Sequence, residues 1–562
     1  MLRPTFLNFE TARRALNTAQ AGLDVVGNNI GNVNTPGFTR QRAVQVSVSN
    51  SFQTQFRVFG GRGSFTGQGA EVTGIQQVRD PYLDTRFRNE ASTHGELAVR
   101  AGGLNDIGRI IDEVAKTGLH DRLTQFISQL STFAKNADSP EIAVVIRNSA
   151  MAVTQAFNRT ANDLATVLDN QRFDLEVAVN DEINTTLERI AFLNERIRQD
   201  HMFGSPANEL MDERNLLIDN LSSFLPITVV RTPERISEER VIENVAIQLS
   251  VGGGNANNIT LVNNDVFTQL RVNTLEDGSA AISLHDGRSG FPIPTAGNDS
   301  NITANITGGG IRGFLDMING KGDFAGNGEN AFRGIPYYIE SLNVIAQAFA
   351  SAMNHTNSIN AEDLTHNSQL TGVQSRPLFV PNQPAGANGP LTAANITLSP
   401  EWLAESAWFT TTKQPIVRVP VLDPQGNPTF DKDNNQIFDR PANSDNILLF
   451  VNLLSSDMTH FRGTNGNGED FLLFRGTFQE SLTSMQSTRG LDASLGNALL
   501  EASELVLGGF ADRRDSISAV SMDEEAVNMM VLQNFYNAAA RFMTVIDEAL
   551  GTIIQNMGVV GR

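Results

Sequence analysis

The sequence predicts a multidomain α+β protein with α-helical coiled-coil ends, a long helical bundle domain, and β-rich domains inserted in the middle of the chain. Three observations predict this class. Apolar residues recur at helical spacing near both ends. The stretch between Gly118 and Gly204 holds no glycine and a single proline. From about Pro226 the composition shifts to Gly, Asn and Thr with short β-prone runs. At 562 residues, the chain is also too long for a single core.

The first helix is predicted from an apolar seam near the N-terminus. Steps between successive seam residues alternate between three and four, which is the heptad spacing of a coiled coil. The seam consists of Phe9, Ala12, Leu16, Ala19, Leu23, Val26 and Ile30. Because alanine recurs in it, this seam suits close packing against a helical partner.

A matching seam predicts the last helix. Its residues are Val527, Val531, Phe535, Ala538, Phe542, Val545, Ala549 and Ile553. Ser521 and Glu524 have the spacing of a capping box, in which the hydroxyl accepts from the Glu524 amide and the carboxylate returns to the Ser521 amide. Asp523, Glu524 and Glu525 also place negative charge at the positive end of the helix dipole.

These two helices allow two interpretations. Each could pack on its own domain, or they could pair with each other and with neighbouring copies of the chain. A helix with so modest an apolar stripe is marginal alone in water. The second interpretation therefore predicts ends that are mobile in the monomer and become ordered on assembly.

The glycine-free stretch predicts a long antiparallel helical bundle, with one helix starting at Asp138-Ser139-Pro140-Glu141. Its apolar residues keep helical spacing: Leu164, Leu168, Leu175, Val179, Ile183, Leu187, Ile190, Leu193 and Ile197. Alternating runs such as 245–251 predict antiparallel sheet after Pro226, and helix is expected to return near Asp470. The expected domains are terminal helices (1–40 with 521–562), a helical bundle (41–225 with 470–520, joined by helix 331–358), and β-rich inserts at 226–330 and 359–469.

A distinctive string follows the first helix, Asn28-Asn29-Ile30-Gly31-Asn32-Val33-Asn34-Thr35-Pro36-Gly37-Phe38-Thr39-Arg40-Gln41. Its local chemistry is a helix stop and a turn, because Asn tolerates left-handed backbone and Pro-Gly favours turns. Together with Leu16, Asn17, Gln20 and Leu23, the string resembles the N-terminal signature of the flagellar rod, hook and hook-associated proteins. Residues 518–526, with Gln533, Tyr536, Ala538 and Ala540, resemble that family's closing motif. The motif positions are Asn28, Asn29, Asn32, Asn34, Thr35, Pro36, Gly37, Arg40, Gln41, Ser521, Asp523, Glu524 and Glu525.

The long helical domain resembles the hook-associated members, whereas hook and rod proteins pass quickly into β-rich domains. This resemblance implies a secreted structural adaptor at the hook–filament junction, exported by the flagellar type III route, whose terminal helices form a ring of identical copies. Implied partners are the chain itself, the hook protein, a second junction protein, flagellin indirectly, and an export chaperone on the C-terminal helix. Another axial protein of hook or rod type, or a surface adhesin role for the β-rich inserts, remains as an alternative.

The amino-acid composition argues against several other classes of function. The formal net charge of −20 disfavours a nucleic-acid partner and an anionic membrane surface. The chain has no cysteine, which excludes disulfides, thiolate catalysis and Cys-type metal sites. No apolar run approaches the ~20 residues that span a bilayer. The N-terminus also lacks the features of a cleaved secretory signal.

Catalytic and cofactor motifs are absent from the sequence. It contains no G-x-x-x-x-G-K-[ST], H-E-x-x-H or G-x-S-x-G pattern. The glycines from Gly60 to Gly69 lack dinucleotide-binding spacing and predict a connecting loop. A cell-wall hydrolase would need paired acids in a cleft, which the sequence does not indicate. We therefore predict a protein that is not an enzyme and has no cofactor.

One segment partly matches a calcium-binding loop. Asp431, Asp433, Asn435 and Asp439 stand at the first, third, fifth and ninth positions. However, Gln436 replaces the required glycine, and Ala442 stands where a bidentate Glu is needed. A β-hairpin turn is the better interpretation, and no metal site is predicted.

Overall fold

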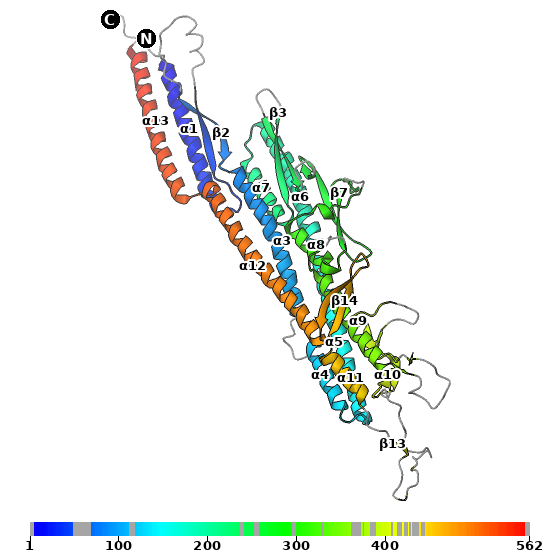
Figure 1. Ribbon diagram of the computed structural model, residues 1–562. Coiled ribbons are helices and arrows are strands. Elements are labelled where there is room, and N and C mark those ends of the chain that lie inside the picture. Colours follow the sequence, from blue (N-terminus) through cyan, green and yellow to red (C-terminus); the bar gives the residue numbers. More distant parts are fainter. Residues whose placement is uncertain are drawn as a thin grey trace.

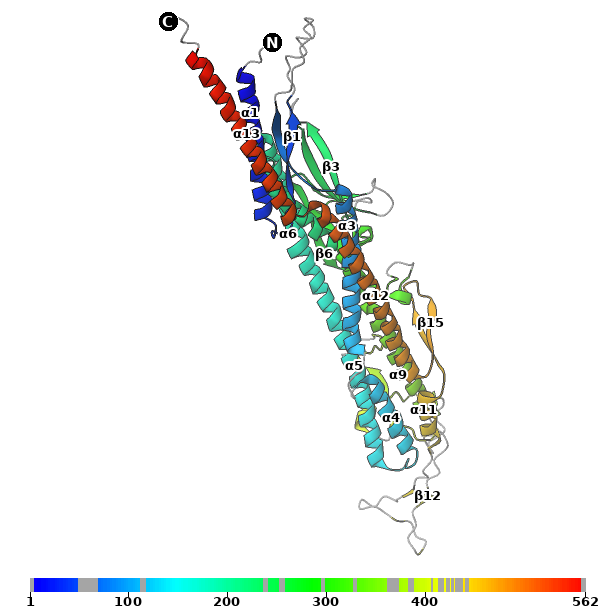
Figure 2. The ribbon, with the colours of Figure 1, turned by 90° about the vertical axis from the view of Figure 1, so that its left-hand side faces the viewer.

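The computed structural model shows an elongated molecule with its two terminal helices together at one end (Figure 1). The structure describes residues 5–48, 69–111, 118–235, 241–251, 258–294, 299–326, 331–360, 373–374, 376–382, 389–405, 408–412, 419–420, 425, 429, 438–439 and 444–556. Long helices run along the molecule, and small antiparallel sheets lie against them (Figure 2). The predicted α+β class is confirmed.

Helices dominate the described part of the chain. They are α1 (Thr5–Gly31), α3 (Pro81–Ile111), α4 (Leu119–Phe133), α5 (Pro140–Val177), the π-helix η1 (Ala178–Ile183), α6 (Asn184–Phe203), α7 (Asn208–Phe224), α8 (Gly309–Asn319), α9 (Ile335–Asn357), α10 (Pro400–Ala404), α11 (Asp445–Ser455), α12 (Phe478–Ser518) and α13 (Met522–Asn556), with short 3-10 turns η3 (Thr303–Asn305) and η4 (Gly322–Phe324).

The strands are mostly short. They are β1 (Gln41–Ser47), β2 (Ala70–Gln77), β3 (Ile227–Arg235), β4 (Val241–Leu249), β5 (Ile259–Asn263), β6 (Val266–Thr274), β7 (Ala280–Asp286), β8 (Ile359–Asn360), β9 (Val373–Gln374), β10 (Phe379–Pro381), β11 (Ile396–Leu398), β12 (Val419–Pro420), β13 (Phe438–Asp439), β14 (Thr459–Thr464) and β15 (Asp470–Gly476). Strands β3 to β7 form one antiparallel sheet in chain order, and the others pair as two-stranded sheets.

The predicted helical stretch after Gly118 is confirmed, including the start of α5. Ser139 caps this helix by accepting a hydrogen bond from the Ile142 amide at 3.3 Å, and Pro140 occupies its first turn. Helix α4 packs against α5, whereas α5, η1 and α6 continue as one long helix rather than as separate antiparallel helices. The predicted apolar residues from Leu164 to Ile197 are all buried except Leu168, which is half-buried.

The residues that the structure describes form two hydrophobic cores along the molecule. One core is built by α6, α7, α8 and the five-stranded sheet, and it includes Leu187, Ile218 and Leu270. The other is built mainly by α4, α5, α9, α11 and the start of α12, and it includes Phe126, Phe349 and Phe478. Helix α3 runs beside α12 and also packs on α7 and α8, so it connects the two regions.

Two expectations for the second half of the chain need correction. The range 359–469 contains helix α11, because Ile447, Phe450 and Leu454 recur at helical spacing and bury in the core. Helix does not return near Asp470. Residues 459–476 instead pair as the β14–β15 hairpin, and α12 begins at Phe478 with a capping box between Thr477 and Glu480.

Candidate assembly interface

The terminal helices α1 and α13 pack side by side at one end of the molecule (Figures 1 and 2). Helix α1 buries Ala12, Ala19 and Val26, which belong to the predicted seam. The helices approach closely at Gly22, where an added Cβ would lie 2.9 Å from Leu532 Cδ2 of α13. Pairing of the two ends with each other, which the second interpretation of the sequence requires, is therefore present in the structure.

The other predicted seam residues of α1 are only partly covered. Leu16, Leu23 and Ile30 are half-buried, and Phe9 is exposed. This side of α1 retains apolar surface that α13 does not cover. The N-terminal seam thus packs partly against α13 and keeps part of its apolar surface exposed.

The predicted seam of α13 does not pack on α1. Val527, Val531, Phe535, Ala538, Phe542, Val545 and Ala549 are all exposed, whereas the α13 residues buried in the chain include Ala539 and Ile546. The Ile553 side chain lies outside the described residues. Helix α13 therefore has two apolar faces. One packs within the chain, and the other is open.

The N-terminal motif forms the base of this helix pair. Asn29 is fully buried, and its side-chain amide bonds both backbone groups of one residue: Oδ1 accepts from Gln41 N at 2.9 Å, and Nδ2 donates to Gln41 O at 3.0 Å. Gly37 in the turn has φ +78°, a conformation that favours glycine. The motif thereby returns the chain from the end of α1 into β1.

A second part of the motif connects α1 to the start of α13. The Arg40 Nε donates to Glu525 Oε1 at 2.8 Å, and its Nη1 donates to Glu524 Oε2 at 2.7 Å. The Arg40 amide donates to Ser518 O at 2.8 Å, at the end of α12. Glu525 is buried and also accepts from Asn29 Nδ2 at 3.3 Å. The two family motifs, distant in the sequence, therefore bind each other.

The predicted capping box of α13 is only half formed. Ser521 Oγ accepts from the Glu524 amide at 3.5 Å, but the Glu524 carboxylate bonds Arg40. A charged guanidinium offers a stronger hydrogen bond than a backbone amide, so the carboxylate turns away from the helix end.

Side-chain hydrogen bonds also hold the turn that follows α1 in the N-terminal motif. Asn32 Nδ2 donates to Asn28 O at 3.0 Å, and Thr35 Oγ1 donates to Asn32 Oδ1 at 3.1 Å.

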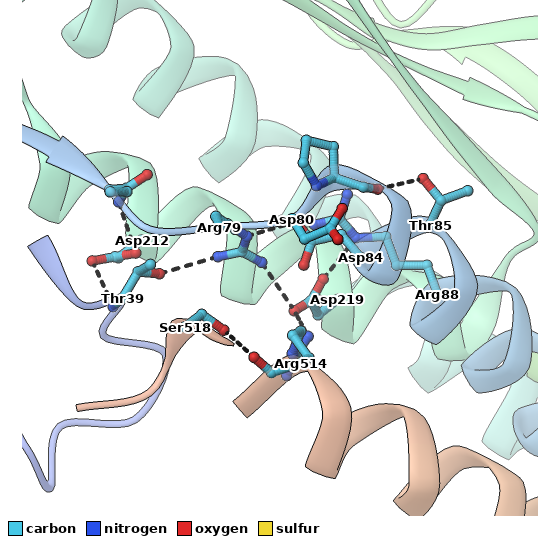
Figure 3. Close-up of polar contacts among 12 residues, drawn as sticks. Thr39, Arg79, Asp80, Asp84, Thr85, Arg88, Asp212, Asp219, Arg514 and Ser518 are labelled. Atoms are coloured by element: carbon cyan, nitrogen blue, oxygen red, sulfur yellow. Dashed lines mark hydrogen bonds and ion pairs between the residues drawn. The ribbon is translucent and has the colours of Figure 1, made fainter. Parts of the chain in front are cut away.

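Helix α7 holds the motif from the other side, through Asp212 (Figure 3). This buried carboxylate accepts from the Thr39 amide at 3.1 Å and from Gln77 Nε2 at 2.8 Å. Burial raises the pKa of Asp212 to about 6, although the hydrogen bonds from Thr39 and the charge of Arg79 act in the opposite direction. Asp212 therefore connects the end of β2 and the segment just before β1 to helix α7.

An ion-pair network lies next to Asp212 (Figure 3). Asp219 of α7 accepts from Arg88 Nε of α3 and from Arg514 Nη1 of α12, each at 2.7 Å. Arg79 Nε donates to Asp84 at 2.6 Å. Burial lowers the pKa of Arg88, while the net shift of the Arg79 pKa is upward because Asp84 and Asp219 outweigh its burial. The network joins α3, α7 and α12 directly below the terminal pair.

We call the contacts of Asn29, Arg40, Asp212, Asp219 and their partners the polar joint. The sequence predicted the motif residues but not Arg79, Asp84, Arg88, Asp212, Asp219 or Arg514. No local spacing could reveal that Asp212 and Asp219 face the motif, because their partners are distant in the sequence.

We also searched the described residues for metal sites and membrane-spanning helices. Within them, no group of three or more His, Cys, Asp or Glu could hold a metal ion, and no helix is long and apolar enough to cross a membrane. Residues 431–437 of the candidate calcium loop and the glycines from Gly60 to Gly67 lie outside the described residues. The part of the loop that is described, β13, pairs antiparallel with β12.

Comparison with known families and proteins gives matches in three parts of the chain. The model of the helical domain of flagellar hook-associated protein FlgK matches residues 104–373. The flagella basal body rod protein model matches residues 9–39, and the C-terminal model of the flagellar basal body rod FlgEFG proteins matches residues 514–556. The two terminal matches coincide with the helices and motifs of the polar joint.

Curated relatives match along nearly the whole chain. Flagellar hook-associated protein 1 of Bacillus subtilis is 26% identical over 573 aligned residues, covering 99% of both chains. Its counterpart in Salmonella typhimurium is 22% identical, over 97% of this chain and 98% of the relative. The chain is similar to flagellar hook-associated protein 1 along nearly its whole length. This similarity, with the matched helical-domain model, supports a hook-associated structural role in the bacterial flagellum.

A solved structure shares the fold. The flagellar hook junction protein FlgK from Burkholderia pseudomallei superposes with a TM-score of 0.53 at 13% sequence identity, over 77% of this chain and all of that one. At this identity the likeness concerns the fold alone. It agrees with the multidomain α+β class.

Proposed function

We propose that the chain is the adaptor that joins the hook to the filament, and that copies form a ring through their terminal helices. The open apolar face of α13 carries this proposal. Val531 and Val545 are 61% and 62% exposed, and Phe535 and Phe542 are 42% and 44% exposed. Exposed apolar surface of this kind marks a place where another protein binds.

A ring requires contacts that repeat from copy to copy. Burying the α13 seam against a neighbouring terminal pair would contribute roughly 25 cal/mol per Å² of apolar area, before the entropy of association is subtracted. Contacts repeated around a closed ring combine many modest affinities. The half-buried Leu16, Leu23 and Ile30 of α1 offer a complementary apolar surface.

The further partners of the proposed assembly are those that the family resemblance implies. In the proposed assembly the terminal pairs lie beside the hook protein below and a second junction protein above, with flagellin added beyond it. Before assembly, the open seam of α13 would be covered by an export chaperone while the chain passes through the type III apparatus to the cell exterior. An axial role of hook or rod type and a surface adhesin role are the alternatives.

A deletion strain tests the place of the chain in the flagellum. We expect electron microscopy of cells lacking the gene to show bare hooks, with unpolymerised flagellin in the medium. Missing hooks would assign the chain to the hook or rod class. Intact filaments would contradict any role at the junction and would favour the adhesin alternative.

A single substitution tests the interface. Phe542→Asp places a charge on the open seam of α13, so we expect a soluble monomer that does not assemble. Asn537→Asp is the matched control, because Asn537 is exposed on the same helix but outside the seam. Normal filaments with Phe542→Asp, or equal loss with Asn537→Asp, would contradict an interface at this face. Leu23→Asp on α1 is expected to abolish assembly as well.

A further inference from the structure

One surface of the molecule is basic although the chain as a whole has a formal net charge of −20. The β14–β15 hairpin packs Phe461 and Phe474 toward the core and turns the alternate residues outward. The exposed residues at its base are His460, Arg462 and Arg475, and His460 stands directly opposite Arg475. Among the residues that the structure describes, neither arginine has an acidic partner.

This basic face also carries apolar surface. Leu472 stands opposite Arg462 and is 53% exposed. The outward Asp470 lies toward the tip of the hairpin, where it accepts a hydrogen bond from Thr464 Oγ1 at 2.9 Å. Within the described residues, the two arginines at the base of the hairpin therefore have no acidic side chain that would neutralise their charge.

A second surface has the opposite charge. Five exposed acids, Asp174, Glu176, Asp181, Glu182 and Glu188, lie where α5 passes through η1 into α6, and no Lys or Arg occurs between them. In the described part of the chain, none of the five forms an ion pair. Phe173, beside the first of them, is 65% exposed. Each surface thus combines unpaired charge with an exposed apolar side chain.

The two surfaces lie on opposite sides of the body. In Figure 2 the β14–β15 hairpin lies at the right edge and the helix running through α5 and α6 lies on the left, where the passage from α5 to α6 is nearer to the terminal helices than the base of the hairpin is. The base of the hairpin therefore cannot contact the acidic stretch of its own chain. A second copy placed alongside, and displaced along the long axis, would bring the hairpin of one chain to the acids of the next. Contacts between two different faces generate rings or helical arrays, which is the geometry of a repeating subunit.

We propose that the base of the β14–β15 hairpin docks on the acidic stretch 173–188 of a neighbouring copy. This inference rests on the proposed ring and adds a second contact to it, far from the terminal helices. Chains with a net charge of −20 repel one another, so a complementary pair of faces favours one relative orientation of neighbours over others. Arg462 and Arg475 pair with the acids, and Leu472 packs with Phe173.

Crosslinking of assembled chains tests the contact directly, because the native chain has no cysteine. The variant Asp181→Cys/Arg475→Cys would be treated with a short bis-maleimide in flagella isolated from cells. We expect a ladder of covalent multimers that rises in steps of the 61.0 kDa chain. The matched control, Asp181→Cys/Ser289→Cys, pairs the same acid position with an exposed residue outside the hairpin and should give no ladder.

Each outcome separates this contact from the proposed ring. If the unmodified chain is absent from isolated flagella, the proposed function itself fails. If the chain is present but the double-cysteine variant gives no ladder, or gives products with a different protein, only the hairpin contact is overturned. A ladder with the control pair would likewise overturn it, because the crosslinking would not depend on the hairpin.

Charge reversal supplies an independent readout. Arg462→Glu/Arg475→Glu should reduce the amount of chain retained in isolated flagella by about tenfold, since each exposed pair contributes a factor of a few and reversal adds repulsion. Combining it with Asp181→Arg/Glu182→Arg should restore most of the loss. Unchanged retention, or loss without restoration in the combined variant, would overturn the pairing. All four residues are exposed, and circular dichroism of each variant checks the fold.

Discussion

Replacing Asp212 by Asn should make the protein more stable at neutral pH. The carboxyl is buried and its pKa is raised from 3.8 to about 6 by that burial, so the native chain holds the proton more tightly than the unfolded chain does. Its stabilising contribution is therefore fully present below about pH 4 and is lost as the pH rises through 6. Asparagine keeps one oxygen to accept from the Thr39 amide, presents an NH2 group in place of the oxygen that accepts from Gln77 Nε2, and carries no charge.

The size of the effect follows from the shift. A difference of about 2.2 pKa units at about 1.36 kcal/mol each gives roughly 3 kcal/mol in the free energy of unfolding as an upper limit. Urea unfolding of wild type and Asp212→Asn between pH 4 and 8, followed by far-UV circular dichroism, measures it. The variant should gain stability relative to wild type as the pH rises and match it near pH 4.

A control and a refuting result complete this test. Asp174→Asn removes one exposed carboxylate from the surface of α5 and controls for the change in net charge. Parallel pH profiles for wild type and Asp212→Asn, or lower stability of the variant at pH 7, would show that burial does not dominate at Asp212. In that case the charged hydrogen bonds to the motif outweigh the cost of desolvation.

Two further substitutions test the terminal helices. Arg40→Met leaves the buried Glu525 carboxylate without its cation and should destabilise the polar joint by about 3 kcal/mol. Faster proteolysis between α12 and α13 would report this loss. The control Arg13→Met removes an exposed ion pair and should change the proteolysis rate little. Gly22→Val forces a side chain into α13 and should cost about 1–3 kcal/mol, measured by hydrogen exchange in α1, whereas Gly27→Val meets nothing within 4 Å and should be neutral or slightly stabilising.

The elements that short-range sequence signals determine were predicted correctly from the sequence. The start of α5 at Ser139-Pro140 follows from capping chemistry within four residues, and the structure has that cap. The apolar spacing from Leu164 to Ile197 predicted both helix and burial correctly. Helix α11 was missed because its burial at Phe450 is created by α4 and α9, elements distant in the chain.

The C-terminal seam shows where spacing alone is ambiguous. Leu532, Ala539 and Ile546 are also seven residues apart, so α13 has two overlapping heptad patterns. The sequence favoured the more apolar pattern, from Val527 to Ile553. The structure packs the other one on α1, where Gly22 leaves room for Leu532. The space left by Gly22 is therefore one reason why this pattern pairs within the chain.

The polar joint explains why the open seam is not buried within the chain. Apolar packing alone would allow α13 to rotate about its axis on α1, because both of its faces are hydrophobic. Arg40 fixes that rotation, since its guanidinium must meet Glu524 and Glu525 at the first turn of α13 while its own amide holds Ser518. Charge-assisted hydrogen bonds are directional, whereas hydrophobic contacts are not. The motif residues therefore set which face of α13 packs inward and leave the seam from Val527 to Ala549 available to a second chain.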